Sequence, residues 1–271
     1  MKTLQPTLYI PHGGGPCFFM DWTMGPPDTW NRLAAWLRAM PTTLPAPPAA
    51  LLVVSAHWEA HVPTVTAGAM PPLVYDYSGF PAHTYELSWP APGSPELAAR
   101  VRALLDGAGI ASAADARRGF DHGVFVPLKV SYPEARIPTV QLSLVSGLDP
   151  TTHLAVGHAL APLRSEGVLI VGSGMSYHNM RGLMTAGALA HSRRFDAWLA
   201  AVVEGDPGQR EASLAQWMQA PSARESHPRE EHLLPLMVAA GAAGDETGTV
   251  AFRDVVMDAS VSAVRFGSLA R

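Results

Sequence analysis

Three histidines of this 271-residue chain stand at or just after the ends of apolar runs that are typical of buried strands. They are His12, His57 and His178, and they lie far apart in the sequence. In an open α/β sheet, the carboxyl ends of the parallel strands line one crevice, where ligands bind. We therefore expect the three imidazoles to meet in one small volume, as a metal ion and its acid/base partner would require.

Two of these histidines have the sequence context of metal ligands. His12 precedes the turn Gly13-Gly14-Gly15-Pro16, where no side chain obstructs a ligand, and the spacing matches neither a P-loop nor a dinucleotide fingerprint. His57 ends a run whose residues should be buried, and a buried imidazole must be hydrogen-bonded or metal-bound. We predict that both bind a metal ion.

A third ligand is expected in the segment 228–236, where Glu231 and His232 are neighbours. The chemistry of the two residues leaves the choice open. Two histidines and a carboxylate are typical of non-haem Fe(II) oxygenases, whereas three histidines and a water also suit zinc.

His122 and His178 are better suited to proton transfer. Imidazole exchanges protons near neutral pH, and further metal ligands would leave no open coordination position. His122 follows Asp121, but adjacent residues of a strand point apart, so we do not expect these two side chains to pair.

The composition is that of a compact enzyme, with 48% hydrophobic and 15% charged residues. The formal charge of −4 argues against binding to nucleic acid. Cys17 is the only cysteine, so an intrachain disulfide and sulfur-rich metal sites are excluded. The chain shows neither a signal-peptide core nor a membrane-length apolar run, which predicts a cytoplasmic protein; a homo-oligomer is compatible with it.

Strand patterns alternate with helix patterns along the chain. The patterns predict strands at 7–11, 50–56, 140–145, 167–173, 250–256 and 260–266, and helices at 29–40, 95–108, 152–163, 188–204 and from 230 to 240. Residues 62–67 are expected to pair beside the second strand as an edge. We predict one α/β domain over residues 1–271, with a mixed, mostly parallel sheet flanked by helices and an active site at the strand carboxyl ends.

Residues 70–95 are rich in proline and aromatic residues and have no regular pattern, which indicates a functional loop. We expect the substrate ring to stack against Trp58, Tyr75, Tyr77 or Phe80. Candidates for gripping a substrate carboxylate are Arg117, Arg118, Lys129 and Arg181.

Taken together, several segments resemble the class III extradiol ring-cleaving dioxygenases, in particular their single-subunit branch that includes 4,5-DOPA dioxygenase. The matching motifs keep their order over nearly the whole chain: Ser55-Ala56-His57-Trp58, Asp76-Tyr77-Ser78-Gly79-Phe80-Pro81, Trp89-Pro90-Ala91-Pro92-Gly93-Ser94-Pro95, Gly119-Phe120-Asp121-His122-Gly123, Ile137-Pro138-Thr139-Val140-Gln141-Leu142-Ser143, Gly172-Ser173-Gly174 leading to His178-Asn179, and Glu231-His232-Leu233-Leu234-Pro235-Leu236.

The resemblance implies a non-haem metal held by His12, His57 and His232, and an acid/base histidine at His178. Better-known relatives with separate subunits have a glutamate as the third ligand, and the helix that follows aligns His232, not Glu231, with that position. Fe(II) is implied for dioxygenation, and zinc would also fit such a site.

The predicted activity is therefore the insertion of O2 into a small catechol, with cleavage beside the diol. His178, with His122 as a second candidate, would accept the catechol proton and return it later. The residues also allow a zinc hydrolase or amidase with the same ligands, or a metal-stabilised binding protein.

Overall fold

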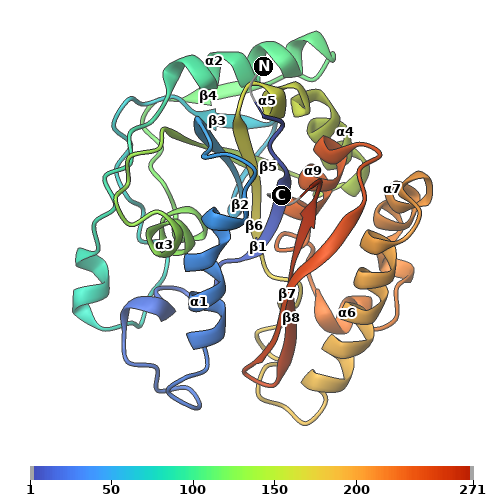
Figure 1. The fold of residues 1–271 in the computed structure, drawn as a ribbon. Helices are drawn as coiled ribbons and strands as arrows, with labels where there is room; N and C mark the ends of the chain where they lie inside the picture. The colour runs from blue at the N-terminus through green and yellow to red at the C-terminus, as the bar shows by residue number, and fades with distance from the viewer. Residues whose placement is uncertain (1–2, 269–271) are drawn as a thin grey trace.

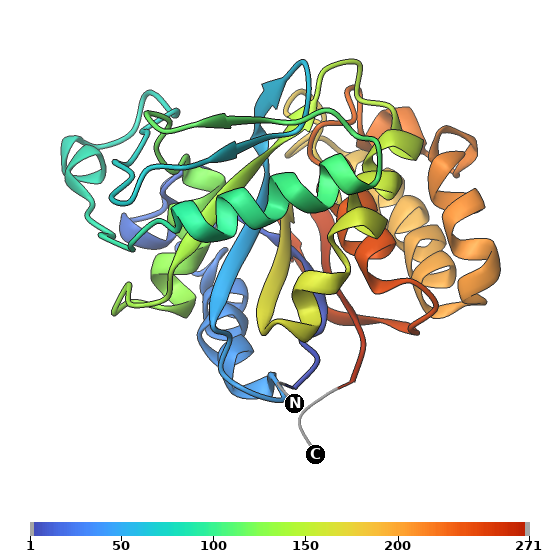
Figure 2. The ribbon, with the colours of Figure 1, turned by 90° about the horizontal axis from the view of Figure 1, so that it is seen from above.

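The computed structural model describes residues 3–268, which form one eight-stranded sheet with helices on both faces (Figures 1 and 2). The strands are β1 (Thr7–Pro11), β2 (Ala50–Ala60), β3 (Thr64–Thr66), β4 (Ala113–Asp115), β5 (Thr139–Val145), β6 (Val168–Gly174), β7 (Gly248–Val256) and β8 (Ala259–Phe266). The helices are α1 (Asn31–Ala39), α2 (Pro95–Gly107), α3 (His122–Ser131), α4 (Pro150–Leu160), α5 (Pro162–Ser165), α6 (Ala188–Glu204), α7 (Pro207–Ala215), α8 (Ala223–Ser226) and α9 (Leu234–Ala243). Four short 3-10 turns complete them: η1 (Cys17–Phe19), η2 (Met40–Thr43), η3 (Ala82–Glu86) and η4 (Trp217–Gln219).

The strand order is β4-β3-β5-β2-β6-β1-β8-β7, and the four central strands β5, β2, β6 and β1 run parallel. β8 pairs antiparallel with β1 on one side, and β3 pairs antiparallel with β5 on the other. The predicted fold class, a mixed and mostly parallel sheet, is confirmed. Residues 1–2 and 269–271 of the predicted domain lie outside the described residues.

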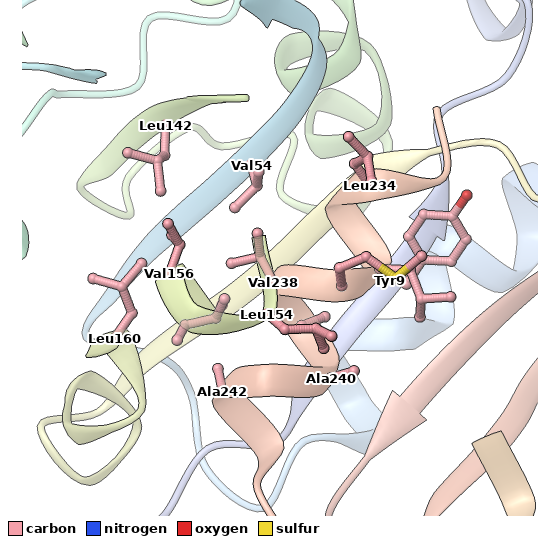
Figure 3. Close-up of a cluster of buried hydrophobic side chains, with 14 of the residues drawn as sticks. Tyr9, Val54, Leu142, Leu154, Val156, Leu160, Leu234, Val238, Ala240 and Ala242 are labelled. Atoms are coloured by element: carbon pink, nitrogen blue, oxygen red, sulfur yellow. The ribbon is translucent and has the colours of Figure 1, made fainter. Parts of the chain in front are cut away.

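Both faces of the central strands are buried, which explains their continuous apolar sequences. In β2, Leu52 and Val54 face one core while Leu51 and Val53 face the other. Figure 3 shows the first of these cores, where side chains of α4 and α9 meet Val54 and Tyr9. Helices α1 and α3 pack on the second core. The two cores cover the faces of the sheet, so a site can lie only at the ends of its strands.

Local signals account for several helix boundaries. The Ser94 side chain accepts a hydrogen bond from the backbone N–H of Leu97, so it caps α2 as predicted. None of the described helices is long and apolar enough to cross a membrane.

Three expectations about elements were wrong. Residues 64–66 lie between β5 and β4 and do not pair beside β2, because β5 is inserted between two strands that are neighbours in sequence. The helix predicted at 152–163 is interrupted before Pro162, whose ring cannot continue an α-helix. The late helix begins at Leu234, so Glu231 and His232 lie in the turn before it.

Helix α3 had no counterpart among the predicted elements. It contains Gly123 and Pro127, two residues that argue against a helix, and all but one of its residues are buried, so no polar face marks it in the sequence.

Candidate metal centre and active site

The structure brings His12, His57 and His232 together at the carboxyl ends of the parallel strands. The ring centroids of His12 and His57 lie 4.8 Å apart, those of His57 and His232 also 4.8 Å, and those of His12 and His232 5.2 Å. His12 follows β1, His57 lies within β2, and His232 precedes α9. Three segments that are remote in the chain therefore share one small volume.

The position of His57 depends on an irregularity in β2. Its pairing with β5 shifts register between Val54 and Glu59, so β2 continues past the point where the sequence predicts its end. The backbone N–H of His57 donates to the Ser55 hydroxyl at 3.2 Å. A glycine at position 123 leaves room for the Ser55 and His57 side chains, because a Cβ there would lie 2.7 Å from Ser55 Oγ and 3.0 Å from His57 Cδ2.

The backbone of His232 is fixed by β1 and β6. The Tyr9 hydroxyl donates to the His232 carbonyl at 2.7 Å, and the Met175 N–H donates to the same oxygen at 3.2 Å. At Gly174, a Cβ would lie only 2.1 Å from that carbonyl, so a glycine is needed for this close approach.

Each of the three rings has an oxygen beside its Nδ1 atom. The carbonyl of Gly13 lies 2.9 Å from His12 Nδ1, Glu231 Oε1 lies 2.9 Å from His232 Nδ1, and Asp76 Oδ2 lies 3.5 Å from His57 Nδ1. A proton on Nδ1 leaves the lone pair on Nε2, and oxygen partners of this kind orient metal-binding histidines.

Two of the Nε2 atoms, those of His12 and His57, face each other, and the third is buried beside them. Those of His12 and His57 are 3.2 Å apart, and His232 Nε2 is buried without a hydrogen-bond partner among the residues the structure describes. Buried polar atoms normally have a partner, and a shared cation would satisfy all three lone pairs. The donor set therefore fits a metal ion.

Burial also keeps these rings neutral, as metal ligands must be. Burial, followed by the neighbouring imidazoles, lowers the pKa of His12 and of His232 well below the usual value. The same causes lower the pKa of His57 to about 3, although Asp76 acts in the opposite direction.

His122 and His178 lie against this group. The His122 ring centroid is 3.9 Å from that of His57, and the His178 ring stacks on His232 at 3.3 Å with an angle of 16° between the planes. Asp76 Oδ1 lies 2.8 Å from the ring atom His122 Nδ1, and the backbone N–H of His122 donates to the same oxygen at 2.9 Å.

Two carboxylates therefore bridge pairs of histidines. Asp76 lies between His57 and His122, while Glu231 Oε1 lies 3.1 Å from His178 Nδ1 and also contacts His232. Burial raises the pKa of both carboxylates, but stronger effects lower both pKa values. For Asp76 these are the hydrogen bonds and charge of His122; for Glu231 they are the hydrogen bond from His178, a backbone hydrogen bond and the charges of His178 and Arg229. Asp76 was not among the predicted site residues, and its only signal in the sequence is its place in one of the resembling motifs.

A second set of possible metal ligands includes His122 in place of His232. Ligand atoms of His12, His57 and His122 lie within 4.8 Å of one another, and so do those of His178, Glu231 and His232. A three-histidine site is thus present, with His122 and His232 as the two candidates for its third imidazole.

Asp121 belongs to a buried network behind the site and does not pair with His122, as expected. Its carboxylate accepts hydrogen bonds from Ser55 Oγ at 2.7 Å and from Gln141, and it forms an ion pair with Arg118 at 3.3 Å. Burial and the charge of Asp76 raise the pKa of Asp121.

A cavity of about 450 Å³ opens above the histidines. All five histidines described above line it, and so do Tyr77 and Phe80, two of the predicted stacking residues. Trp58 and Tyr75 do not line it, so their predicted contact with substrate is not supported. Trp58 packs beneath the Arg118 guanidinium at 5.0 Å, and the Tyr75 hydroxyl donates to the Leu87 carbonyl.

The predicted carboxylate-binding residues also lie elsewhere. Arg118 is held by Asp121, and Lys129 donates to the Ser88 carbonyl. Neither these two residues nor Arg117 and Arg181 are among the residues that line the cavity.

Comparison with known proteins identifies the family of this chain. Residues 7–265 match the family model of the catalytic LigB subunit of aromatic ring-opening dioxygenase. The 4,5-DOPA dioxygenase extradiol of Portulaca grandiflora is 43% identical over 249 residues, which cover 90% of this chain and 89% of that protein. The protein of the same name from Escherichia coli is 34% identical over 273 residues, with 98% and 96% covered. Dioxygenase tasH of Hapsidospora irregularis is 39% identical over 264 residues, with 90% and 79% covered.

A solved structure is also similar. The crystal structure of an uncharacterized protein from Escherichia coli K12 superimposes with a TM-score of 0.75 at 32% sequence identity, covering 97% of this chain and 100% of that one. The fold, the histidine cluster and the sequence similarity converge: the chain belongs to the family of catalytic LigB subunits of aromatic ring-opening dioxygenases, and it is an extradiol ring-opening dioxygenase.

Proposed function

We propose that this enzyme uses O2 to open the ring of a small catechol beside its diol, at a non-haem metal held by His12, His57 and His232, and that residues 1–271 act as one catalytic domain. The observation that carries the proposal is the convergence of three buried imidazoles. Each has an oxygen partner at Nδ1, the Nε2 atoms of His12 and His57 are 3.2 Å apart, and His232 Nε2 is buried without a partner among the described residues.

His232 is preferred to His122 as the third ligand because of its surroundings. Its Nε2 atom is buried without a partner among the described residues, which is costly for a polar atom unless something binds there. Glu231 is then the partner that orients the ring. Bound at this site, Fe(II) would act as a Lewis acid toward the diol, as zinc also could. Fe(II) would in addition supply an electron to O2, which zinc cannot do.

His178 and His122 are placed to move protons. The Nδ1 atom of each lies beside a carboxylate, Glu231 or Asp76, which leaves its Nε2 atom free to exchange a proton with a substrate hydroxyl. Both residues line the cavity that would hold the catechol ring. The adjacent carboxylate stabilises the imidazolium that forms when a proton is accepted, so the residue can return that proton later in the reaction.

The cavity wall suits a flat ring. Phe80 and Tyr77 pack edge to face, with centroids 5.5 Å apart, and Tyr77 also contacts the His122 ring. We infer that the substrate ring lies against Phe80. The family and the named relatives favour this dioxygenase activity over the zinc hydrolase that the residues alone left open.

The experiment is a metal and oxygen test. Protein loaded with Fe(II) without air should leave a catechol unchanged, and admitting air should produce a yellow ring-opened product with uptake of one O2 per ring. Protein loaded with zinc serves as the control and should not consume O2. Hydrolysis of esters or amides by the zinc form, with every catechol left intact by the iron form, would refute the proposal.

A further inference from the structure

The cavity above the histidines is walled mainly by apolar side chains. Beyond the histidines, its wall includes two tryptophans, two tyrosines, one phenylalanine and five methionines, and the methionines are Met24, Met175, Met180, Met184 and Met257. Methionine is flexible and polarisable, and it adapts to apolar ligands of different shape.

The mouth of the cavity is apolar as well. Met24, Met180 and Met184 are 41%, 67% and 55% exposed. Among the described residues, seven large hydrophobic side chains are strongly exposed, and these three all line this one cavity. Exposed apolar side chains that gather at one place indicate a binding surface rather than chance exposure.

Outside the histidine cluster, the wall offers no cationic side chain to an anionic group on the ring substituent. Within the described residues 3–268, no lysine or arginine lines the cavity, and Asp76 is its one carboxylate. Apart from the histidines, the remaining polar groups, such as the hydroxyls of Ser78 and Tyr177, are neutral. A neutral group can hydrogen-bond an ether, hydroxyl or carbonyl oxygen, but it does not offset the cost of removing a carboxylate from water.

From this wall we infer that the enzyme selects catechols whose ring substituent is uncharged and apolar, and that it disfavours substituents bearing a carboxylate, including the amino-acid side chain of DOPA. The inference rests on the proposed function. Met180, at the cavity mouth, is a specificity-determining position.

A matched pair of compounds tests the inference. 3-(3,4-Dihydroxyphenyl)propanamide and 3-(3,4-dihydroxyphenyl)propanoate differ in one charge and hardly in shape. With metal-loaded protein, calorimetry without air should give a Kd at least about tenfold lower for the amide, because a carboxylate on the ring substituent finds no lysine or arginine in the cavity wall. L-DOPA should bind as weakly as the propanoate, and 4-propylcatechol as tightly as the amide.

A variant pair tests the position. Met180→Arg should strengthen binding of the propanoate and so reduce or invert the preference for the amide. Met70→Arg places the same charge at a 70% exposed position away from the cavity and should leave that preference unchanged. Equal or tighter binding of the propanoate by the unmodified enzyme would overturn the inference, and so would a Met180→Arg variant with unchanged preference.

Binding and turnover separate the two proposals. If catechols bind with the expected preference but none consumes O2, the proposed function fails and the substrate class stands. If the propanoate and L-DOPA are cleaved faster than the neutral compounds and bind more tightly, the substrate class fails and the dioxygenase stands.

Discussion

Replacing His232 and His122 separately decides which imidazole completes the metal centre. In our assignment, His232→Gln removes a ligand, whereas His122→Gln removes a hydrogen bond to Asp76 and leaves all three ligands in place. Loss of a partner that only orients a ligand weakens metal binding by about 10- to 100-fold. We therefore expect a loss above about 100-fold, or more than about 2.8 kcal/mol, for His232→Gln, and a loss of no more than about tenfold for His122→Gln.

The assay is titration of metal-free protein with Zn²⁺ by calorimetry, with metal content measured after dialysis. Circular dichroism of each metal-free variant checks that the fold is retained, because His232 is buried and its carbonyl accepts hydrogen bonds from Tyr9 and Met175. Loss of stoichiometric metal in His122→Gln, together with its retention in His232→Gln, would refute the assignment. The ligands would then be His12, His57 and His122.

Three other perturbations follow from the same contacts. His178→Asn should keep metal and substrate binding but lower kcat by about 10²- to 10⁴-fold, the usual contribution of a general acid or base; loss of metal would instead make His178 a ligand. Asp76→Asn should weaken metal affinity or activity by about 10- to 100-fold, because the carboxylate that holds both His57 and His122 loses its charge; unchanged metal titration and unchanged kcat/KM would contradict this role. His227 is buried, and burial lowers its pKa to about 3. Between about pH 6.5 and pH 3, the unfolded chain therefore binds a proton that the folded chain does not, and the free energy of unfolding decreases as the pH is lowered. Urea unfolding of metal-free His227→Gln should therefore show about 2 kcal/mol less loss of stability between pH 7 and pH 5 than the unmodified protein, and an identical pH dependence of the two proteins would disprove it.

Local sequence patterns predicted the central strands because these strands are covered on both faces, and such burial produces an apolar run that is visible without any knowledge of contacts. The topology of parallel strands then placed His12 and His57 at one edge, as the structure shows. Strand β3, which was predicted to be an edge beside β2, was misplaced for the opposite reason. Its pairing with β5 and β4 depends on a segment inserted from much later in the chain.

The sequence by itself determined the α/β fold class, the gathering of histidines at the strand ends and the resemblance to ring-cleaving dioxygenases, because periodicity and motif order are properties of neighbouring residues. Only the tertiary structure decided that Asp76 and Glu231 each hold two histidines, that Trp58 and Tyr75 lie outside the cavity, and that no predicted arginine or lysine reaches it. Hydrogen bonds and cavity walls join segments that are far apart in the chain. Their partners are set by how the loops pack on the sheet, which no local pattern encodes.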